Sequence, residues 1–167
     1  MAIPVVDLAE FTHGTPDQKA SFVQNLGKAY EEVGFVAVKN HGVPDELIAN
    51  QYEYVQQFFA LPLEKKKQYE IPGLAGQRGY TSFGKEHAKG SDAPDLKEFF
   101  QYGQTVEDHD AIKSEYPDNV QVAEIAPLNE TLFNAYRNFE KSGKALLQAI
   151  ALYLGLDEHY FDQYVHN

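Results

Sequence analysis

Apolar residues recur at three- and four-residue steps in three stretches of the chain, and this spacing predicts three amphipathic helices. The start of the first helix is indicated by Thr15, which can cap a helix, and by Gln18, which can complete a capping box. Gly34 suits its end, because glycine accepts the left-handed backbone conformation. The second begins at Pro44 and ends at Leu61, which precedes a proline. The two apolar stripes contain Phe22, Val23, Leu26, Tyr30 and Val33, then Leu47, Ile48, Tyr52, Val55, Phe58 and Phe59.

The longest periodic stretch covers residues 127–154 and predicts a helix roughly 40 Å long. Gly155 follows it and is expected to terminate it. Asp157 can then cap a last short helix. The apolar positions of the long helix are Leu128, Leu132, Tyr136, Phe139, Leu146, Ile150 and Leu154, and those of the short one are Phe161, Tyr164 and Val165.

Short apolar runs rich in β-formers predict three strands. Residues 3–7 suit an edge strand, because Pro4 cannot donate to a ladder. Residues 35–38 are expected to form a buried strand that a tight turn follows. Residues 96–102 alternate imperfectly, so both faces of this third strand are expected to be partly covered.

The remaining segments are interpreted as connections. Residues 63–69 predict a brief helical turn, whose run Lys65-Lys66-Lys67 is interpreted as a solvated face. Five glycines between positions 73 and 90 indicate a long loop with an extended segment near 79–83. Residues 103–126 are polar and irregular, and neither loop separates two obvious cores, so one domain over residues 1–167 is expected.

Composition narrows the class of protein. A chain of 167 residues with 43% hydrophobic residues can bury a core. Its formal charge of −11 repels phosphate backbones and argues against nucleic acid as a partner. Cysteine is absent, which excludes disulfides and thiolate metal sites. No apolar run approaches the roughly 20 residues that span a bilayer, and no secretory leader is recognisable at the N-terminus, so a cytoplasmic location is expected.

The histidines offer weak candidates for metal binding. Iron in the facial-triad class of oxygenases takes two imidazoles and one carboxylate, and a His-x-Asp pair on a strand supplies two of them. None of the six histidines begins His-x-Asp or His-x-Glu. The reversed pairs, Glu107 with His109 and Asp157 with His159, leave a short metalloprotein as the least favoured reading. His41 is interpreted as a turn residue whose ring bonds nearby backbone.

The glycine-rich loop at residues 76–84 holds the best candidate for ligand binding. Arg78 is one of only two arginines and lies two residues before Tyr80. Its planar guanidinium could clamp a substrate carboxylate, and the alternative is a surface salt bridge. We therefore name Arg78 and Tyr80 as candidate substrate-binding residues, with no catalytic or metal-binding residue in the chain.

Five motifs in the right order carry a family resemblance. Together they resemble the N-terminal part of the isopenicillin N synthase-like non-haem iron(II), 2-oxoglutarate-dependent oxygenases. The motifs are Ile3-Pro4-Val5-Val6-Asp7, the stretch from Gly34-Phe35 to Asn40-His41-Gly42, Phe58-Phe59-Ala60-Leu61-Pro62-Leu63-Glu64-Lys65-Lys66, Gly79-Tyr80, and Asp95-Leu96-Lys97-Glu98-Phe99-Phe100.

The resemblance implies an α+β fold, the N-terminal helical and strand region of a double-stranded β-helix (jelly-roll) oxygenase whose catalytic barrel is incomplete in this chain. It implies that the long helix supports that barrel from outside and that the loop of Arg78 and Tyr80 borders the substrate pocket. In the family, the iron triad and an Arg-x-Ser pair for 2-oxoglutarate come later in the chain.

Two functions follow from the resemblance. The first is the N-terminal segment of an oxidoreductase that uses iron(II) and 2-oxoglutarate to hydroxylate, desaturate or cyclise a small organic molecule. The segment alone is expected to bind neither cofactor and to be inactive. The alternative is a non-enzymatic binding protein on the same scaffold. Exposed apolar faces on residues 35–38, residues 96–102 and the long helix are expected to favour a homodimer or another association.

Overall fold

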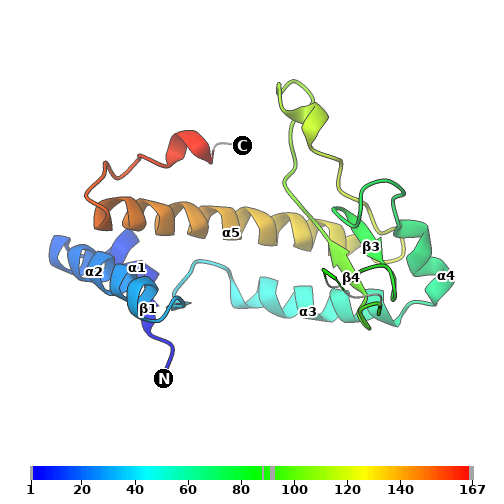
Figure 1. Cartoon of the computed structure of the whole chain (residues 1–167), viewed down its shortest axis with the longest axis horizontal. Coiled ribbons are helices and arrows are strands. Elements are labelled where there is room, and N and C mark those ends of the chain that lie inside the picture. The colour runs from blue at the N-terminus through cyan, green and yellow to red at the C-terminus, as the bar shows by residue number, and fades with distance from the viewer. Residues whose placement is uncertain (1, 88, 91–92, 166–167) are drawn as a thin grey trace. The chain divides into compact units, whose positions relative to one another are not determined.

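The computed structural model describes residues 2–87, 89–90 and 93–165 (Figure 1). Contacts divide the chain into two units, Met1–Pro44 with Arg137–Asn167 and Asp45–Tyr136. The single domain expected over residues 1–167 therefore stays a prediction. None of the helices in the described ranges is long and apolar enough to cross a membrane.

The first unit combines both ends of the chain. It contains β1 (Val5–Asp7), α1 (Leu8–Thr12), α2 (Pro16–Glu32), β2 (Ala37–Lys39), the second part of α5 (Ala126–Tyr153) and the 3₁₀ turn η3 (Asp162–Tyr164). β1 and β2 pair in parallel, with Val6 opposite Val38. The core consists of Val6, Leu8, Phe11, Phe22, Val23, Leu26 and Ala149.

Helix α2 begins at the predicted capping box. The Thr15 N–H donates to Gln18 Oε1 at 2.8 Å, and the Gln18 N–H donates to Thr15 Oγ1 at 3.3 Å. Gly34 follows the helix with φ +80°, as predicted. Helix α1 was not predicted, and the Asp7 side chain caps it by accepting from the Ala9 N–H at 3.0 Å.

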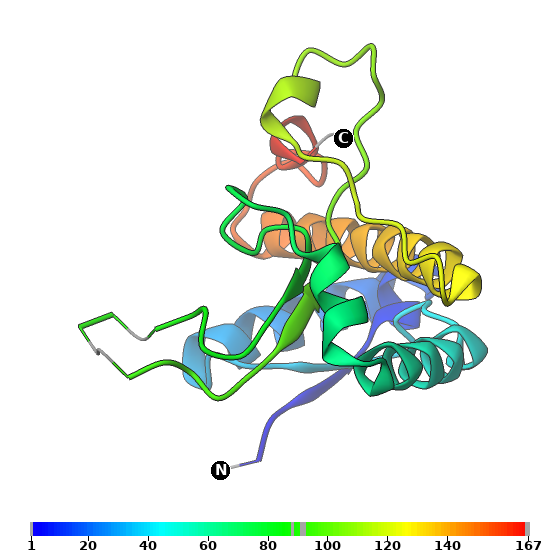
Figure 2. The ribbon, with the colours of Figure 1, turned by 90° about the vertical axis from the view of Figure 1, so that its right-hand side faces the viewer.

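The second unit contains α3 (Asp45–Ala60), α4 (Leu63–Lys66), the 3₁₀ turns η1 (Lys67–Tyr69) and η2 (Lys113–Glu115), β3 (Gly79–Thr81), β4 (Phe99–Gln101) and the first part of α5. β3 and β4 lie side by side and antiparallel, with Tyr80 opposite Phe100 (Figure 2). Phe58 is the centre of the core, and its ring centroid lies 4.8 Å from that of Phe100 and 5.9 Å from that of Tyr80. The other buried members are Val122, Ile125, Leu128 and Leu132.

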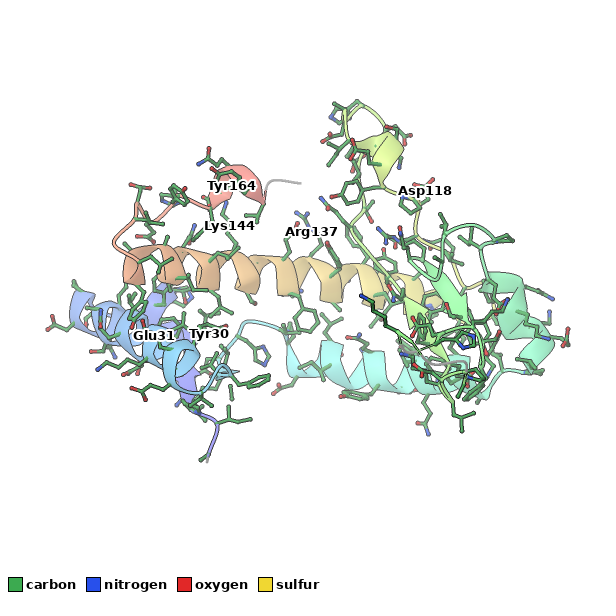
Figure 3. The ribbon with its side chains drawn as sticks, in the orientation of Figure 1. Tyr30, Glu31, Asp118, Arg137, Lys144 and Tyr164 are labelled. Carbon is green, nitrogen blue, oxygen red and sulfur yellow. The ribbon has the colours of Figure 1, made fainter. Side chains whose placement is uncertain are left out.

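Helix α5 confirms the long-helix prediction within one residue at each end. It ends in a Schellman arrangement, in which the Gly155 N–H bonds the Leu152 carbonyl and the Leu156 N–H bonds the Ala151 carbonyl. Gly155 has φ +74°, as expected for this position. Lys144 on α5 points toward the C-terminal segment that carries Tyr164, and its Nζ lies 3.3 Å from Asp162 Oδ2 (Figure 3).

Several local predictions about strands and apolar faces were wrong, and Phe139, placed in the apolar stripe of α5, is 60% exposed. The second strand is not buried: it starts only at Ala37, and Phe35 is 69% exposed. The strand expected at residues 96–102 is shorter, and Leu96 is 90% exposed. Tyr52 is 76% exposed and lies outside the apolar stripe of α3. The expected last helix consists of turns followed by η3. Each named strand pairs with one other, so the described strands form two separate two-stranded sheets.

Candidate functional site

A pocket of about 510 Å³ lies in the second unit, between the end of η1 and the loop after β3. Arg78 and Tyr80, the two residues nominated from the sequence, both line it. Sequence reasoning did not nominate the other ionisable residues of its lining. These are Glu70, Lys85, Glu86 and His87.

Gly79 determines the backbone conformation between Arg78 and Tyr80. Its φ is +73°, a conformation that side chains disfavour. A Cβ added here would lie 2.3 Å from the Tyr69 carbonyl oxygen, because Glu70 and Gly79 form a bridge. Only glycine therefore allows β3 to approach η1 this closely.

Arg78 has unused hydrogen-bonding capacity. Its Nη1 donates to the Gln77 carbonyl at 2.7 Å, whereas its Nε is buried without a partner. The guanidinium lies against Gly103, where an added Cβ would fall 2.2 Å from Arg78 Cζ. Among the described residues no carboxylate pairs with Arg78, so the surface salt bridge considered for it is not found there. A buried donor without an acceptor is costly, which suits a site that an incoming acceptor completes.

Tyr80 is 2% exposed, and its hydroxyl donates to Glu98 Oε2. Burial, with the hydrogen bond and charge of Glu98, raises the pKa of the phenol far above its ordinary range. The hydroxyl therefore stays protonated and committed to Glu98. Tyr80 therefore has no free hydroxyl to offer to the pocket that it lines.

Lys66 completes this network and corrects the prediction that all three neighbouring lysines are solvated. It is only 7% exposed, and its Nζ donates to both oxygens of Glu98, at 2.8 and 3.0 Å, and to the Phe59 carbonyl at 3.1 Å. Partial burial opposes ionisation of Glu98, but the hydrogen bonds from Lys66 and Tyr80 outweigh it and lower the pKa of that carboxyl.

Glu70 joins the two edges of the pocket. Its Oε1 accepts from the Ser82 N–H at 3.0 Å, and its Oε2 lies 3.5 Å from Lys85 Nζ. Burial opposes ionisation, but the Ser82 hydrogen bonds and the Lys85 charge lower the pKa of Glu70. The negative charge of Glu70 is thus already matched within the protein.

His41 and His159 are engaged in local structure. His41 Nδ1 accepts from the Val43 N–H at 3.2 Å, which confirms its reading as a turn residue. His159 Nδ1 lies 3.0 Å from Asp162 Oδ2, and the His159 N–H donates to Asp157 Oδ1 at 2.8 Å. His109 is exposed in a turn. Within the described ranges no group of three or more His, Cys, Asp or Glu side chains could hold a metal ion, so these residues do not fit iron(II).

Residues 3–124 match the family described as non-haem dioxygenase in morphine synthesis, N-terminal. The match covers more than half of the 167 residues, so the chain belongs to this family. Its class is the non-haem iron(II), 2-oxoglutarate-dependent oxygenases, of which the matched region is the N-terminal part. The family resemblance and the α+β class are thereby confirmed.

Characterised relatives include the Validamycin A dioxygenase of Streptomyces hygroscopicus subsp. limoneus, which is 31% identical over 165 residues, 96% of this chain and 45% of that protein. The 1-aminocyclopropane-1-carboxylate oxidase of Dictyostelium discoideum is 30% identical over 166 residues, 95% of this chain and 44% of that protein.

Two crystal structures show the same fold. A 2-oxoglutarate/Fe(II) oxygenase family protein from Caulobacter crescentus superposes with a TM-score of 0.83 at 34% identity, over 96% of this chain and 51% of the other. A full-length Neurospora crassa protein, solved in complex with alpha-ketoglutarate, superposes with a TM-score of 0.77 at 25% identity, over 96% of this chain and 46% of the other. The chain thus spans about half the length of these relatives.

Proposed function

We propose that this chain is the N-terminal segment of an iron(II), 2-oxoglutarate-dependent oxidoreductase that hydroxylates, desaturates or cyclises a small organic molecule. The family match over residues 3–124 carries the proposal. In it, the jelly-roll barrel that holds iron and 2-oxoglutarate is incomplete in residues 1–167, which are inactive alone. A cytoplasmic location is part of the proposal.

Within this function, Arg78 and Tyr80 border the substrate pocket. Tyr80 lines this pocket without a free hydroxyl, because its hydroxyl is committed to Glu98. Arg78 supplies donors for a carboxylate of the substrate, because its Nε lacks a partner. These residues bind and orient, and no chemical step is assigned to them.

The inactivity of the chain alone is tested by anaerobic titration with iron(II) and by assaying succinate formation from 2-oxoglutarate in air. We expect neither stoichiometric iron binding nor succinate above the protein-free control. Tight equimolar iron binding by residues 1–167 would contradict the proposal. Sequencing the coding region beyond Asn167 is the complementary test, and a His-x-Asp, a later His and an Arg-x-Ser there would support it.

The role of Arg78 is tested with benzoate as a carboxylate probe and benzamide as its neutral counterpart. Binding is followed on the Nε–H resonance of Arg78 by NMR. We expect benzoate alone to shift this resonance. Arg78→Gln, for which binding is followed on the benzoate proton signals instead, should not bind. Gly103→Ala should weaken benzoate binding, because the new methyl group would occupy the space in which the Arg78 guanidinium lies. Equal responses to the two probes would refute a carboxylate site.

The alternative is a non-enzymatic interaction protein on this scaffold, and the exposed apolar side chains make it testable. Phe35 is 69% and Leu96 90% exposed. Such surface favours self-association or a protein partner. Sedimentation velocity separates the readings: aggregation or dimerisation fits an enzyme segment, and a stable compact monomer favours a surface adapted to independent function.

A further inference from the structure

Two consecutive lysines of α4 make the same kind of contact in opposite surroundings. The Lys66 side chain is 8% exposed and pairs with Glu98 at 2.8 Å. The Lys65 side chain is 51% exposed and pairs with Glu124 at 3.4 Å. Each glutamate also accepts a hydrogen bond from a tyrosine hydroxyl. The chain therefore contains a buried Lys–Glu–Tyr network and an exposed counterpart of the same composition.

The buried network is fully satisfied. An ammonium group has three protons, and Lys66 finds three acceptors, namely the Phe59 carbonyl and the two Glu98 oxygens. A buried charge is tolerated only with such complete pairing. Because the ionised Glu98 can only accept, the Tyr80 hydroxyl must donate to it. The direction of every hydrogen bond in the network is thus fixed.

The network holds one strand of the pocket from inside. Tyr80 is the central residue of β3, and its ring packs against Phe58 with centroids 5.9 Å apart. Arg78 directly precedes this strand, lines the pocket, and has its guanidinium against Gly103. Arg78 and Tyr80 are only two residues apart, so the backbone of β3 links the hydrogen bond to Glu98 with the position of Arg78. Local geometry of this kind sets how well a site is preorganised.

We propose that Lys66 and Glu98 are positioning residues of the pocket. Acting through the Tyr80 hydroxyl, they fix β3 so that the Arg78 guanidinium faces the ligand. The value of this arrangement for substrate binding rests on the proposed function, whereas its effect on Arg78 is a property of the chain itself. Lys65 and Glu124, with the same chemistry at the surface, have no such role.

The positioning is tested in the ligand-free chain by hydrogen exchange of the Arg78 Nε–H. Tyr80→Phe keeps the ring but removes the donor, and we expect it to speed this exchange about tenfold. Tyr69→Phe removes the donor to Glu124 in the exposed network, together with the acceptor of the Ala123 N–H, and should leave the rate unchanged. Equal rates in wild type and Tyr80→Phe, with both proteins folded, would overturn the proposal.

The buried ion pair of Lys66 and Glu98 allows a second, independent test. Lys66→Met leaves the Glu98 carboxylate without its cation, and we expect faster Arg78 exchange and lower stability. Adding Glu98→Gln to that variant removes the unpaired charge and restores an acceptor for Tyr80, so the slow exchange should return. Lys65→Met is the matched control and should behave as wild type. If the double variant recovers stability but not slow exchange, the network is only structural and the proposal fails.

Benzoate binding separates this proposal from the proposed function. If both hold, Tyr80→Phe weakens benzoate binding about tenfold while Tyr69→Phe does not. If wild type does not bind benzoate but Tyr80→Phe still speeds the Arg78 exchange, the carboxylate site is refuted and the positioning stands. If benzoate binds equally to wild type and Tyr80→Phe, the positioning role is refuted.

Discussion

Replacing Gly79 by alanine should destabilise the second unit more than any other single methyl group placed in the pocket loop. Gly79 has φ +73°, and its added Cβ would lie 2.3 Å from the Tyr69 carbonyl oxygen and 2.8 Å from Val120 Cγ2. A backbone carbonyl cannot swing away as a flexible side chain can. The substitution therefore combines a conformational and a steric penalty.

The two penalties can be separated with Gly73. Holding alanine in the left-handed region costs about 1–2 kcal/mol. Relieving the contact with the Tyr69 carbonyl adds about 1–3 kcal/mol, as in an overpacked core, so Gly79→Ala should lose about 2–5 kcal/mol. Gly73 has φ +87° and no neighbour within 4 Å of its added Cβ. Gly73→Ala should therefore lose only the conformational part of the stability, about 1–2 kcal/mol.

The assay is urea unfolding at pH 7, followed by circular dichroism and by tyrosine fluorescence, since the chain has 11 tyrosines and no tryptophan. Unchanged denaturant slopes would show that the same surface is exposed in all three proteins. Equal losses for Gly79→Ala and Gly73→Ala would refute the steric argument and the close approach of β3 to η1.

Two further predictions concern the first unit and pH. Gly27→Ala in α2 should lower the thermal midpoint, because its Cβ would fall 2.2 Å from the Tyr153 ring. The Cβ of Gly143→Ala in α5 meets nothing within 4 Å, so this substitution should stabilise the protein by about 1 kcal/mol. A rise of the midpoint for both variants would contradict the packing of Gly27 against Tyr153. Because the folded-state pKa of Glu98 is lowered, its contribution to the free energy of unfolding is present above the ordinary glutamate pKa and lost as pH falls through the lowered one. The stability difference between wild type and Glu98→Gln should therefore shrink between pH 7 and pH 3 in urea titrations, and a constant difference would contradict this.

The sequence predicts best where local chemistry and periodicity agree. The capping box at Thr15 and the glycine that ends α5 were both foreseen, because each depends on residues within one or two turns. Helix α1 was not predicted, because five residues are too few to show a helical period and its cap, Asp7, belongs to the preceding strand.

The candidate site was foreseen in part. Arg78 and Tyr80 stood out because a cation and a phenol are conspicuous in a glycine-rich loop, and both line the pocket. Lys66 was misjudged because it lies in a run of three lysines. Pro62 interrupts the helical phase before it, so nothing in the local pattern indicates which lysine turns inward. Its partner, Glu98, is 32 residues away, and only the folded chain brings the two together.

The first unit is assembled from the two ends of the chain, whereas the second is one continuous stretch. On the ribosome, every residue of the second unit is made before the segment that starts at Arg137. At translation rates of about 5–20 residues per second, the second unit has seconds in which to form, far longer than helices and hairpins need. During that interval Phe22 and Leu26 of α2 lack Ala149, a partner in their core, so the N-terminal core is completed only after the second unit has been made.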